Sequence, residues 1–243
     1  FDHIDCNVTS REFHTITGLY KGKRISVVSH GIGTDNIDIV LNELDALANI
    51  DFDTRQEKES FRQLTLVRVG TSGGLQDETP IGTYVAAEHS IGFDGVLYFY
   101  GDTERVRNRS FEAELLKQLD WSIEGLRPYV VAADPSLIEQ ICQQDILRGN
   151  TIAANGFYGP QGRQLRLPLH DPELNKKIQA FDYEGRHLTN YEMESSSLAA
   201  LSALMGHRAM TVCCIIAGRK AQNMNTDYKG SIEGLIDLVL ERI

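Results

Sequence analysis

An arginine followed by a glycine-rich run is the most chemically suggestive feature of this 243-residue sequence. Arg68 ends an apolar stretch and is followed by Gly70, Thr71 and two further glycines, in the segment RVGTSGG. Arginine donates paired charge-assisted hydrogen bonds, threonine donates one more, and glycine lets the backbone approach an anion closely. The segment therefore predicts a phosphate site, although the same arginine could instead cap the C-terminus of a neighbouring helix.

Two carboxylates stand two residues apart in the segment NYEMES, residues 190–195. A carboxylate in a pocket can accept hydrogen bonds from two vicinal hydroxyls, which is what the 2′,3′-diol of a ribose presents. This pattern predicts Glu192 and Glu194 as sugar ligands, with Met193 as an apolar floor between them. Ordinary helix capping by the carboxylates and core packing by Met193 are the competing interpretations.

A third segment, FYGPQGR at residues 157–163, combines a ring, an amide and a guanidinium. The ring of Phe157 can stack on a base, and Arg163 can donate to a carbonyl oxygen. The amide of Gln161 pairs with a group that offers one donor and one acceptor. The edge of uracil offers these groups, but an isolated Gly-Pro turn would also explain the segment.

A glycine turn follows the first apolar run in the segment SHGIG. Gly31 and Gly33 begin like a dinucleotide-binding fingerprint, but Asn36 stands where the third glycine is expected. The pattern instead predicts a tight turn from a strand into a helix that Thr34, Asp35 or Asn36 caps. We therefore set a Rossmann oxidoreductase aside.

Short β-branched runs alternate with amphipathic segments, and together they must position these side chains. We expect strands at residues 24–28, 64–69, 84–87, 95–100 and 208–216. We expect helices at residues 34–47, 110–119, 135–145 and 193–205. The first strand is expected to be buried, and the charged segment 51–61 to be solvated. The alternation predicts one α/β domain over residues 1–243, with a central mixed sheet and helices on both of its faces.

Composition excludes several classes of protein. The chain is 42% hydrophobic and 24% charged, which is unlike disordered or collagen-like proteins. Its net charge of -10 argues against binding to nucleic acid or to an anionic membrane. The longest apolar run, residues 209–217, is too short to span a bilayer, and no signal peptide is visible. We therefore expect a cytoplasmic protein.

The four cysteines are Cys6, Cys142, Cys213 and Cys214, and their spacing is not that of a metal site. We expect them to be small buried thiols in a reducing compartment. The adjacent pair lies in a strand-like run, so its two side chains should point to opposite faces.

Taken together, these motifs resemble the nucleoside phosphorylase-I family, and within it the branch that cleaves uridine. The resemblance rests on five segments: SREF at 10–13, SHGIG at 29–33, RVGTSGG at 68–74, FYGPQGR at 157–163 and NYEMES at 190–195. It implies a sheet that is partly closed like a barrel, and phosphorolysis of uridine to uracil and ribose 1-phosphate. It implies no metal and no cofactor, with inorganic phosphate as the co-substrate.

The resemblance also implies a role for individual residues. The implied phosphate ligands are Arg68, Gly70, Thr71 and Gly31, with Arg11 from the neighbouring subunit. The implied ribose ligands are Glu192, Met193, Glu194 and Thr71. The implied base ligands are Phe157, Gln161, Arg163, Ile216, Ala217 and Arg219, the last of which would order Arg163 or the loop that closes over the base. Arg68, Glu194 and Arg163 would be the catalytic residues of at least a homodimer, with a trimer of dimers also open.

One departure from the family concerns the phosphate site. The family's first strand ends in a Gly-Asp-Pro-x-Arg loop that completes this site, and no such segment occurs in the chain. By its offset from SREF the loop would precede Phe1, so we expect an N-terminal segment to be missing from this sequence. Without that loop, the alternative is a non-catalytic protein that binds nucleosides.

A second departure concerns the base. Purine-cleaving relatives carry an aspartate after the last core strand, whereas residues 216–219 of this chain contain no carboxylate. Uracil can leave without such an acid, because its negative charge resides on exocyclic oxygens. The sequence therefore favours a pyrimidine substrate over the other readings, a purine phosphorylase or a nucleosidase that uses water.

Overall fold

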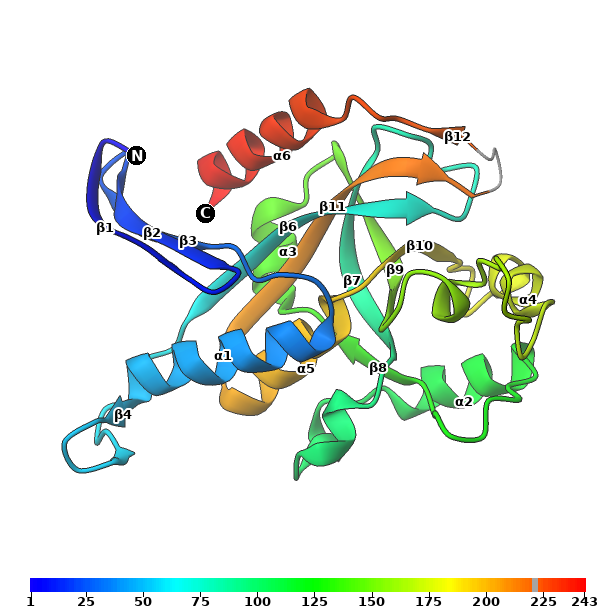
Figure 1. Ribbon diagram of the computed structural model, residues 1–243, viewed down its shortest axis with the longest axis horizontal. Helices are drawn as coiled ribbons and strands as arrows, with labels where there is room; N and C mark the ends of the chain where they lie inside the picture. Colours follow the sequence, from blue (N-terminus) through cyan, green and yellow to red (C-terminus); the bar gives the residue numbers. More distant parts are fainter. Residues whose placement is uncertain (220–222) are drawn as a thin grey trace.

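The computed structural model describes residues 1–219 and 223–243, and its centre is a closed five-stranded barrel (Figure 1). The barrel strands are β6 (Thr65–Gly74), β7 (Tyr84–Phe93), β9 (Ile146–Ala154), β10 (Leu188–Glu192) and β11 (Arg208–Gly218). Parallel pairs join β11 to β6, β10 to β9 and β9 to β7, while the β6–β10 and β7–β11 pairs are antiparallel. The predicted mixed, partly closed sheet is thus confirmed.

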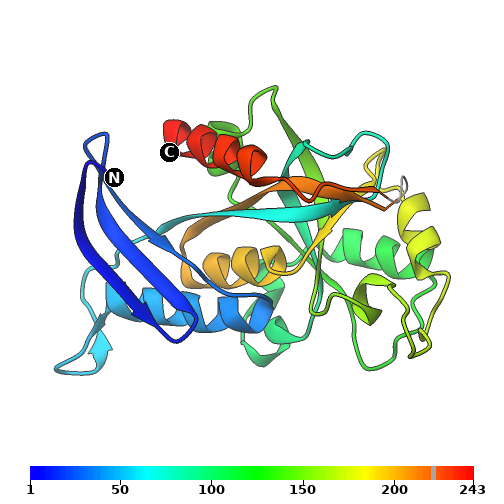
Figure 2. The ribbon, with the colours of Figure 1, turned by 45° about the horizontal axis from the view of Figure 1, so that its top comes forward.

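Two further strands, β8 (Tyr129–Ala132) and β12 (Asn223–Met224), extend the sheet beside β7 and β11. The helices are α1 (Thr34–Asn49), α2 (Arg109–Gln118), α3 (Pro135–Ile141), α4 (Leu174–Ala180), α5 (Ser195–Met205) and α6 (Lys229–Arg242). Figures 1 and 2 show α1 beside α5, α3 beside α6, and α2 near α4, around the barrel. None of the helices in the described ranges is long and apolar enough to cross a membrane.

Aromatic and aliphatic side chains fill the space between the barrel and these helices. Under α2 and α4, the Phe111 ring stacks on Phe181 and Tyr183, with centroids 5.6 and 4.4 Å apart. A second cluster packs β11 against α3 and α6, and a third packs α1 against α5. Each fully buried large apolar side chain contributes roughly 1.5–3 kcal/mol, so these clusters hold the barrel's outer faces in place.

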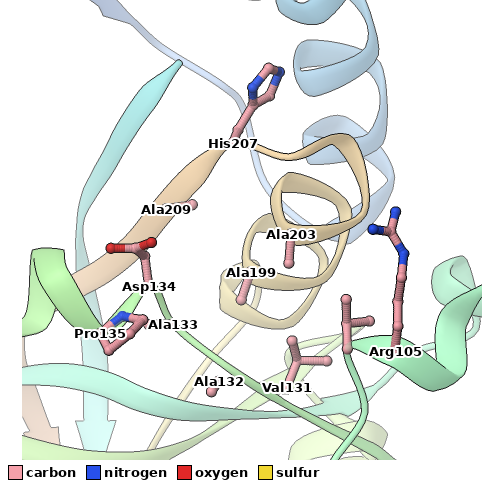
Figure 3. Close-up of a pocket in the computed structure, with 11 residues that line it drawn as sticks. Arg105, Val131, Ala132, Ala133, Asp134, Pro135, Ala199, Ala203, His207 and Ala209 are labelled. Carbon is pink, nitrogen blue, oxygen red and sulfur yellow. The ribbon is translucent and has the colours of Figure 1, made fainter. Parts of the chain in front are cut away.

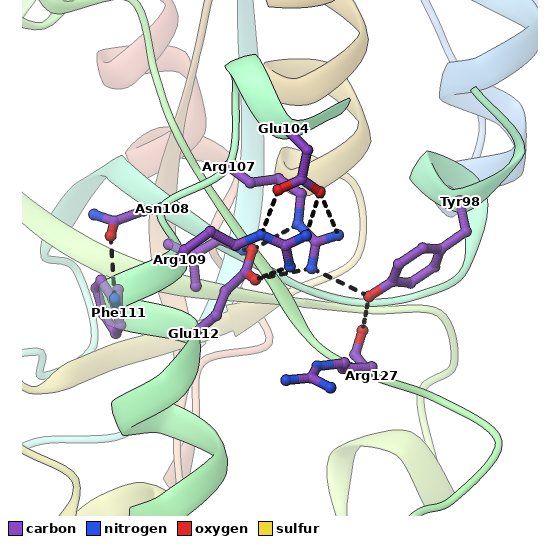
Figure 4. Close-up of polar contacts among 9 residues, drawn as sticks. Tyr98, Glu104, Arg107, Asn108, Arg109, Phe111, Glu112 and Arg127 are labelled. Carbon is purple, nitrogen blue, oxygen red and sulfur yellow. Dashed lines mark hydrogen bonds and ion pairs between the residues drawn. The ribbon is translucent and has the colours of Figure 1, made fainter. Parts of the chain in front are cut away.

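An ion-pair network ties α2 to β8 (Figure 4). The carboxylate of the buried Glu112 accepts hydrogen bonds from Nε and Nη2 of Arg107 and from Nη1 of Arg109, each at 2.8 Å. Its Oε1 also accepts the backbone N–H of Val130 at 3.1 Å. Because this buried carboxylate has several donors, it fixes the helix start against the strand.

The N-terminal strands form a separate antiparallel sheet, seen at the left of Figure 2. Its strands are β1 (His3–Ser10), β2 (Phe13–Tyr20) and β3 (Lys23–Val28). The strand predicted at residues 24–28 is therefore present, but its predicted burial is wrong, since Val27 is 50% exposed. β-Branched side chains favour extended backbone with or without burial, and β3 pairs with β2 outside the barrel.

The strand predicted at residues 95–100 is also wrong. The chain forms a short 3₁₀ helix there, η1 (Val96–Phe99), after β7 has ended at Phe93. Asp94 Oδ1 accepts the backbone N–H of Val96 at 3.0 Å, and Leu97 is buried beside Tyr129. The apolar run is buried through a helical turn, a case in which short runs do not distinguish strand from helix.

Three smaller expectations need correction. The helix predicted at residues 135–145 ends at Ile141. The α1 helix starts at Thr34, but its N-cap is Gly33 and no side chain caps it. Among the cysteines, three are buried as expected, and Cys213 and Cys214 lie in different environments, but Cys6 is exposed on β1. The segment 51–61 is exposed as expected, and its strand β5 (Gln56–Glu57) pairs with β4 (Ile50–Asp51).

Candidate active site

Arg68 lies in the middle of β6, and its side chain is only 8% exposed. The guanidinium folds back over Gly70, where an added Cβ would lie 2.9 Å from both Nη atoms. Contacts under 3 Å are too close for carbon and nitrogen. Glycine at position 70 is therefore what allows Arg68 to adopt this position.

Four neighbours surround the Arg68 guanidinium. Its Nη1 lies 3.0 Å from Glu192 Oε2 and 3.5 Å from Cys213 Sγ, while Nη2 pairs with Glu194 Oε2. Its Nε donates to His30 Nε2 at 3.2 Å. Burial alone would lower the pKa of Arg68, but Glu192, Cys213 and Glu194 hold that pKa above its usual value. Arg68 is therefore a buried cation stabilised by its acidic neighbours.

Glu192 caps the start of α5 with its carboxylate. Its oxygens accept the backbone N–H of Glu194 at 2.9 Å, and the backbone N–H and hydroxyl of Ser195 at 3.0 and 2.6 Å. Arg68 is the fourth donor. Burial raises the pKa of Glu192, Arg68 opposes that rise and Glu194 adds to it. A carboxylate has about four lone-pair sites, so that of Glu192 is already fully used.

Glu194 has room for further hydrogen bonds. Its Oε1 accepts the backbone N–H of Gly33 at 2.7 Å, and its Oε2 accepts Arg68. These are its two side-chain donors within the described residues, so about two of its four lone-pair sites remain. Although the sequence predicts both carboxylates as sugar ligands, Glu194 is the one with acceptor capacity left.

His30 was missed by the sequence analysis. It lies between β3 and α1, and burial, with Arg68 next, lowers its pKa to about 4. The imidazole is therefore neutral at ordinary pH and can accept the Arg68 Nε–H. In the sequence, the only indication of this role is that His30 directly precedes the glycine turn. In the structure, Gly31 of that turn has a φ of 75°, in the left-handed region.

A second cluster gathers around Gln161, which ends the 3₁₀ helix η3 (Gly159–Gln161). Its Oε1 accepts Arg219 Nη2 at 2.8 Å and Arg163 Nη1 at 2.5 Å. The Arg163 guanidinium lies 3.8 Å from the Phe157 ring centroid, and the Arg219 guanidinium lies 4.5 Å from the Tyr191 ring centroid. The structure thus brings Phe157, Gln161, Arg163 and Arg219 together.

The two arginines of this cluster share an amide oxygen without a balancing anion. In the part of the chain that the structure describes, neither Arg163 nor Arg219 pairs with a carboxylate. Burial, followed by the charge of Arg163, lowers the pKa of Arg219 to about 10, and burial also lowers the pKa of Arg163. The cluster therefore contains two partly desolvated cations that a nearby negative charge would stabilise.

The remaining predicted residues are less directly connected to these clusters, and Ile216 packs against the apolar cluster between β11, α3 and α6. Partly buried are Gly31, Gly70, Thr71, Met193, Ile216 and Ala217. Arg11 is exposed at the turn between β1 and β2, and no interaction among the described residues joins it to either cluster. Both clusters involve β10, because the Tyr191 ring centroid lies 4.5 Å from the Arg219 guanidinium and the adjacent Glu192 contacts Arg68.

A cavity of about 250 Å³ lies apart from both clusters, against the side of α5 (Figure 3). Small apolar residues of α5 and β11 line much of it, and its polar side chains have other partners. Asp134 caps α3, Arg105 donates to the Leu204 carbonyl, and His207 contacts Asp45. The described residues also contain no group of three or more His, Cys, Asp or Glu side chains suited to a metal ion. The two clusters are therefore the candidate site.

Comparison with known proteins identifies the family. Residues 1–233 match the family model described as the phosphorylase superfamily. The uridine phosphorylase of Thermococcus kodakarensis is 28% identical over 86% of this chain and 63% of its own length, so the chain spans less than two thirds of that relative. A DeoD-type purine nucleoside phosphorylase of Alkaliphilus metalliredigens is 25% identical over 99% of this chain and 84% of its own length.

Solved structures agree with the family model. A Trypanosoma brucei nucleoside phosphorylase, described as showing uridine phosphorylase activity, superimposes with a TM-score of 0.87 at 26% identity. The match covers 99% of this chain and 86% of that one. The chain therefore belongs to the phosphorylase superfamily and has the nucleoside phosphorylase fold.

Proposed function

We propose that the chain is a cytoplasmic uridine phosphorylase, which converts uridine and inorganic phosphate to uracil and ribose 1-phosphate. The observation that carries the proposal is the pair of arginines on Gln161 Oε1, for which the described residues supply no carboxylate. Such a pair suits a base that leaves as an anion with its charge on exocyclic oxygens.

The sugar end of the site would hold the two reacting partners. Glu194 has acceptor capacity for the two ribose hydroxyls, while Arg68, Gly70, Thr71 and Gly31 would bind phosphate. Arg11 of a second copy would complete the anion site in a homodimer. Phosphate then attacks C1′ as the bond to the base breaks, so the sugar becomes oxocarbenium-like, and much of the rate would come from positioning.

The base end would stabilise the leaving group. Phe157 would stack on the uracil ring, with Met193, Ile216 and Ala217 as the apolar lining nearby. Gln161 and Arg163 would donate to the uracil oxygens as negative charge develops on them, and Arg219 would hold both in place. This is preorganised electrostatic stabilisation, which needs no side-chain nucleophile.

The test is uracil release from uridine by the full chain, with and without inorganic phosphate, and with inosine run in parallel. Cleavage of uridine that depends on phosphate, and that is much faster than cleavage of inosine, is the expected result. Faster cleavage of inosine than of uridine would indicate the purine activity named for the Alkaliphilus relative. Cleavage without phosphate would indicate a nucleosidase, and binding without turnover would indicate a nucleoside-binding protein.

A further inference from the structure

The loop of residues 29–33 contacts both members of the Arg68–Glu194 ion pair. His30 Nε2 accepts Arg68 Nε at 3.2 Å, and the backbone N–H of Gly33 donates to Glu194 Oε1 at 2.7 Å. We propose that His30 is a positioning residue, which aims Arg68 at the phosphate by accepting its Nε–H. This inference rests on the proposed function and assigns a role to a residue outside the predicted site.

The argument begins with the number of donors on Arg68. A guanidinium has five N–H groups in a fixed planar fork. The Nε–H is given to His30, the two Nη1 hydrogens face Glu192 and Cys213, and one Nη2 hydrogen is given to Glu194. One Nη2 hydrogen remains for a ligand. Because the fork is rigid, the bond at Nε acts together with the contacts at Nη1 and Nη2 to fix where that last hydrogen points.

The protonation state of His30 follows from its role as acceptor. Nε2 must carry a lone pair toward Arg68, so the ring proton resides on Nδ1. Nδ1 is buried and has no hydrogen-bond partner among the described residues. A protonated ring would offer no lone pair and would place a second cation against Arg68, with Glu192 as the nearby anion. The neutral ring is therefore the form that orients the arginine.

Two substitutions separate this role from a general packing role. His30→Gln places an amide oxygen near the position of Nε2, so it can still accept from Arg68. His30→Asn is shorter and reaches only the position of Nδ1. We expect His30→Asn to raise the KM for phosphate about tenfold and to change kcat less, because a buried donor on a charged group loses its acceptor. His30→Gln should stay within about threefold of the unsubstituted protein.

His89 supplies a matched control. This histidine lies on β7 and is also half-buried, with a lowered pKa. Its Nδ1 lies 3.2 Å from Oδ1 of Asn150 on β9. His89→Asn and His89→Gln should both leave the KM for phosphate unchanged. The proposal is overturned if His30→Asn keeps the original KM, or if His30→Gln is impaired as much as His30→Asn.

A second measurement does not depend on turnover. Two-bond proton–nitrogen spectra of the histidine-labelled full chain report the tautomer of each ring, and the signal of His30 is the one lost in His30→Gln. The expected signal has Nε2 unprotonated and Nδ1 protonated. A ring protonated at Nε2 overturns the proposal even if uridine is cleaved. Absence of phosphorolysis, together with the expected tautomer, overturns the proposed function and leaves the contact with Arg68 established.

Discussion

The two ends of the candidate site differ in how their arginines are balanced. At the sugar end, Arg68 lies between Glu192 and Glu194, and these acidic neighbours raise its pKa. At the base end, Arg163 and Arg219 share a neutral amide, and burial lowers the pKa of both. The charge of Arg68 is already balanced by carboxylates, whereas no carboxylate among the described residues balances Arg163 and Arg219. Under the proposed function, this difference corresponds to positioning at one end and charge stabilisation at the other.

The largest expected effect comes from breaking the balanced end. Glu194→Gln removes the charge that pairs with Arg68 and weakens the acceptor for the ribose hydroxyls. We expect kcat/KM for uridine to fall about 10³-fold, similar to the loss of one preorganised contact in the transition state. Steady-state kinetics measure this, with the exposed Glu173→Gln as the control. Near-normal turnover in a folded Glu194→Gln protein would remove the ribose role.

The next effect comes from breaking the unbalanced end. Arg163→Ala removes one of the two cations at Gln161 and the ring contact with Phe157. Loss of a charge-assisted hydrogen bond of about 2 kcal/mol should lower the ratio of uridine to inosine cleavage ~30-fold. The ratio is measured as relative kcat/KM, with the exposed Arg186→Ala as the control. An unchanged ratio would contradict the assignment of the base end.

A smaller change tests the position of Arg68 while keeping its charge. Gly70→Ala places a Cβ 2.9 Å from both Nη atoms, so the guanidinium must move. We expect the KM for phosphate to rise about tenfold, because misplacement of a positioning group costs binding. Gly125→Ala, where a Cβ meets nothing within 4 Å, is the control. Equal KM values for phosphate in the two variants would show that phosphate binding does not depend on the position of the Arg68 guanidinium over Gly70.

The smallest expected effect is on how folding stability depends on pH, through His30 at the sugar end. The pKa of His30 falls from 6.5 to about 4 on folding, so between these values the unfolded chain binds more protons. Stability is therefore lost as pH falls through this window. After discounting for solvent screening, we expect the unsubstituted protein to lose about 1 kcal/mol more than His30→Gln between pH 7 and pH 4.5. Denaturant titrations at both pH values measure this, and parallel losses would refute it.

Much of the site could be predicted because its residue types are distinctive. The glycine run beside an arginine, and the amide between an aromatic ring and an arginine, each had a competing structural interpretation, and the structure brings the members of each group together. The residue pattern alone could not distinguish Glu192 from Glu194, since both are carboxylates at one helix start, and only the family resemblance singled out Glu194. The difference arises from nearby backbone donors, those of α5 for Glu192 and the distant Gly33 for Glu194.

The fold was predictable to a similar depth. Alternating apolar runs indicated a mixed sheet with helices, but they carried no signal for the pairing of β7 with β11 that closes the barrel. Such pairing depends on the twist of strands far apart in the sequence. The strand prediction for residues 95–100 was wrong for a related reason. Leu97 is buried by contact with Tyr129 from a 3₁₀ helix, and not as part of a sheet.

The hydrogen bond from Gly33 to Glu194 joins the start of α1 to the residue proposed to hold the sugar. For a ligand that changes the strength of this bond when it binds Glu194, thermodynamic reciprocity requires that the state of the α1 start also alters the ligand affinity. The amide proton of Gly33 therefore offers a way to follow changes at Glu194. Its rate of exchange with solvent would register the occupancy of the sugar end without any label near the ligand.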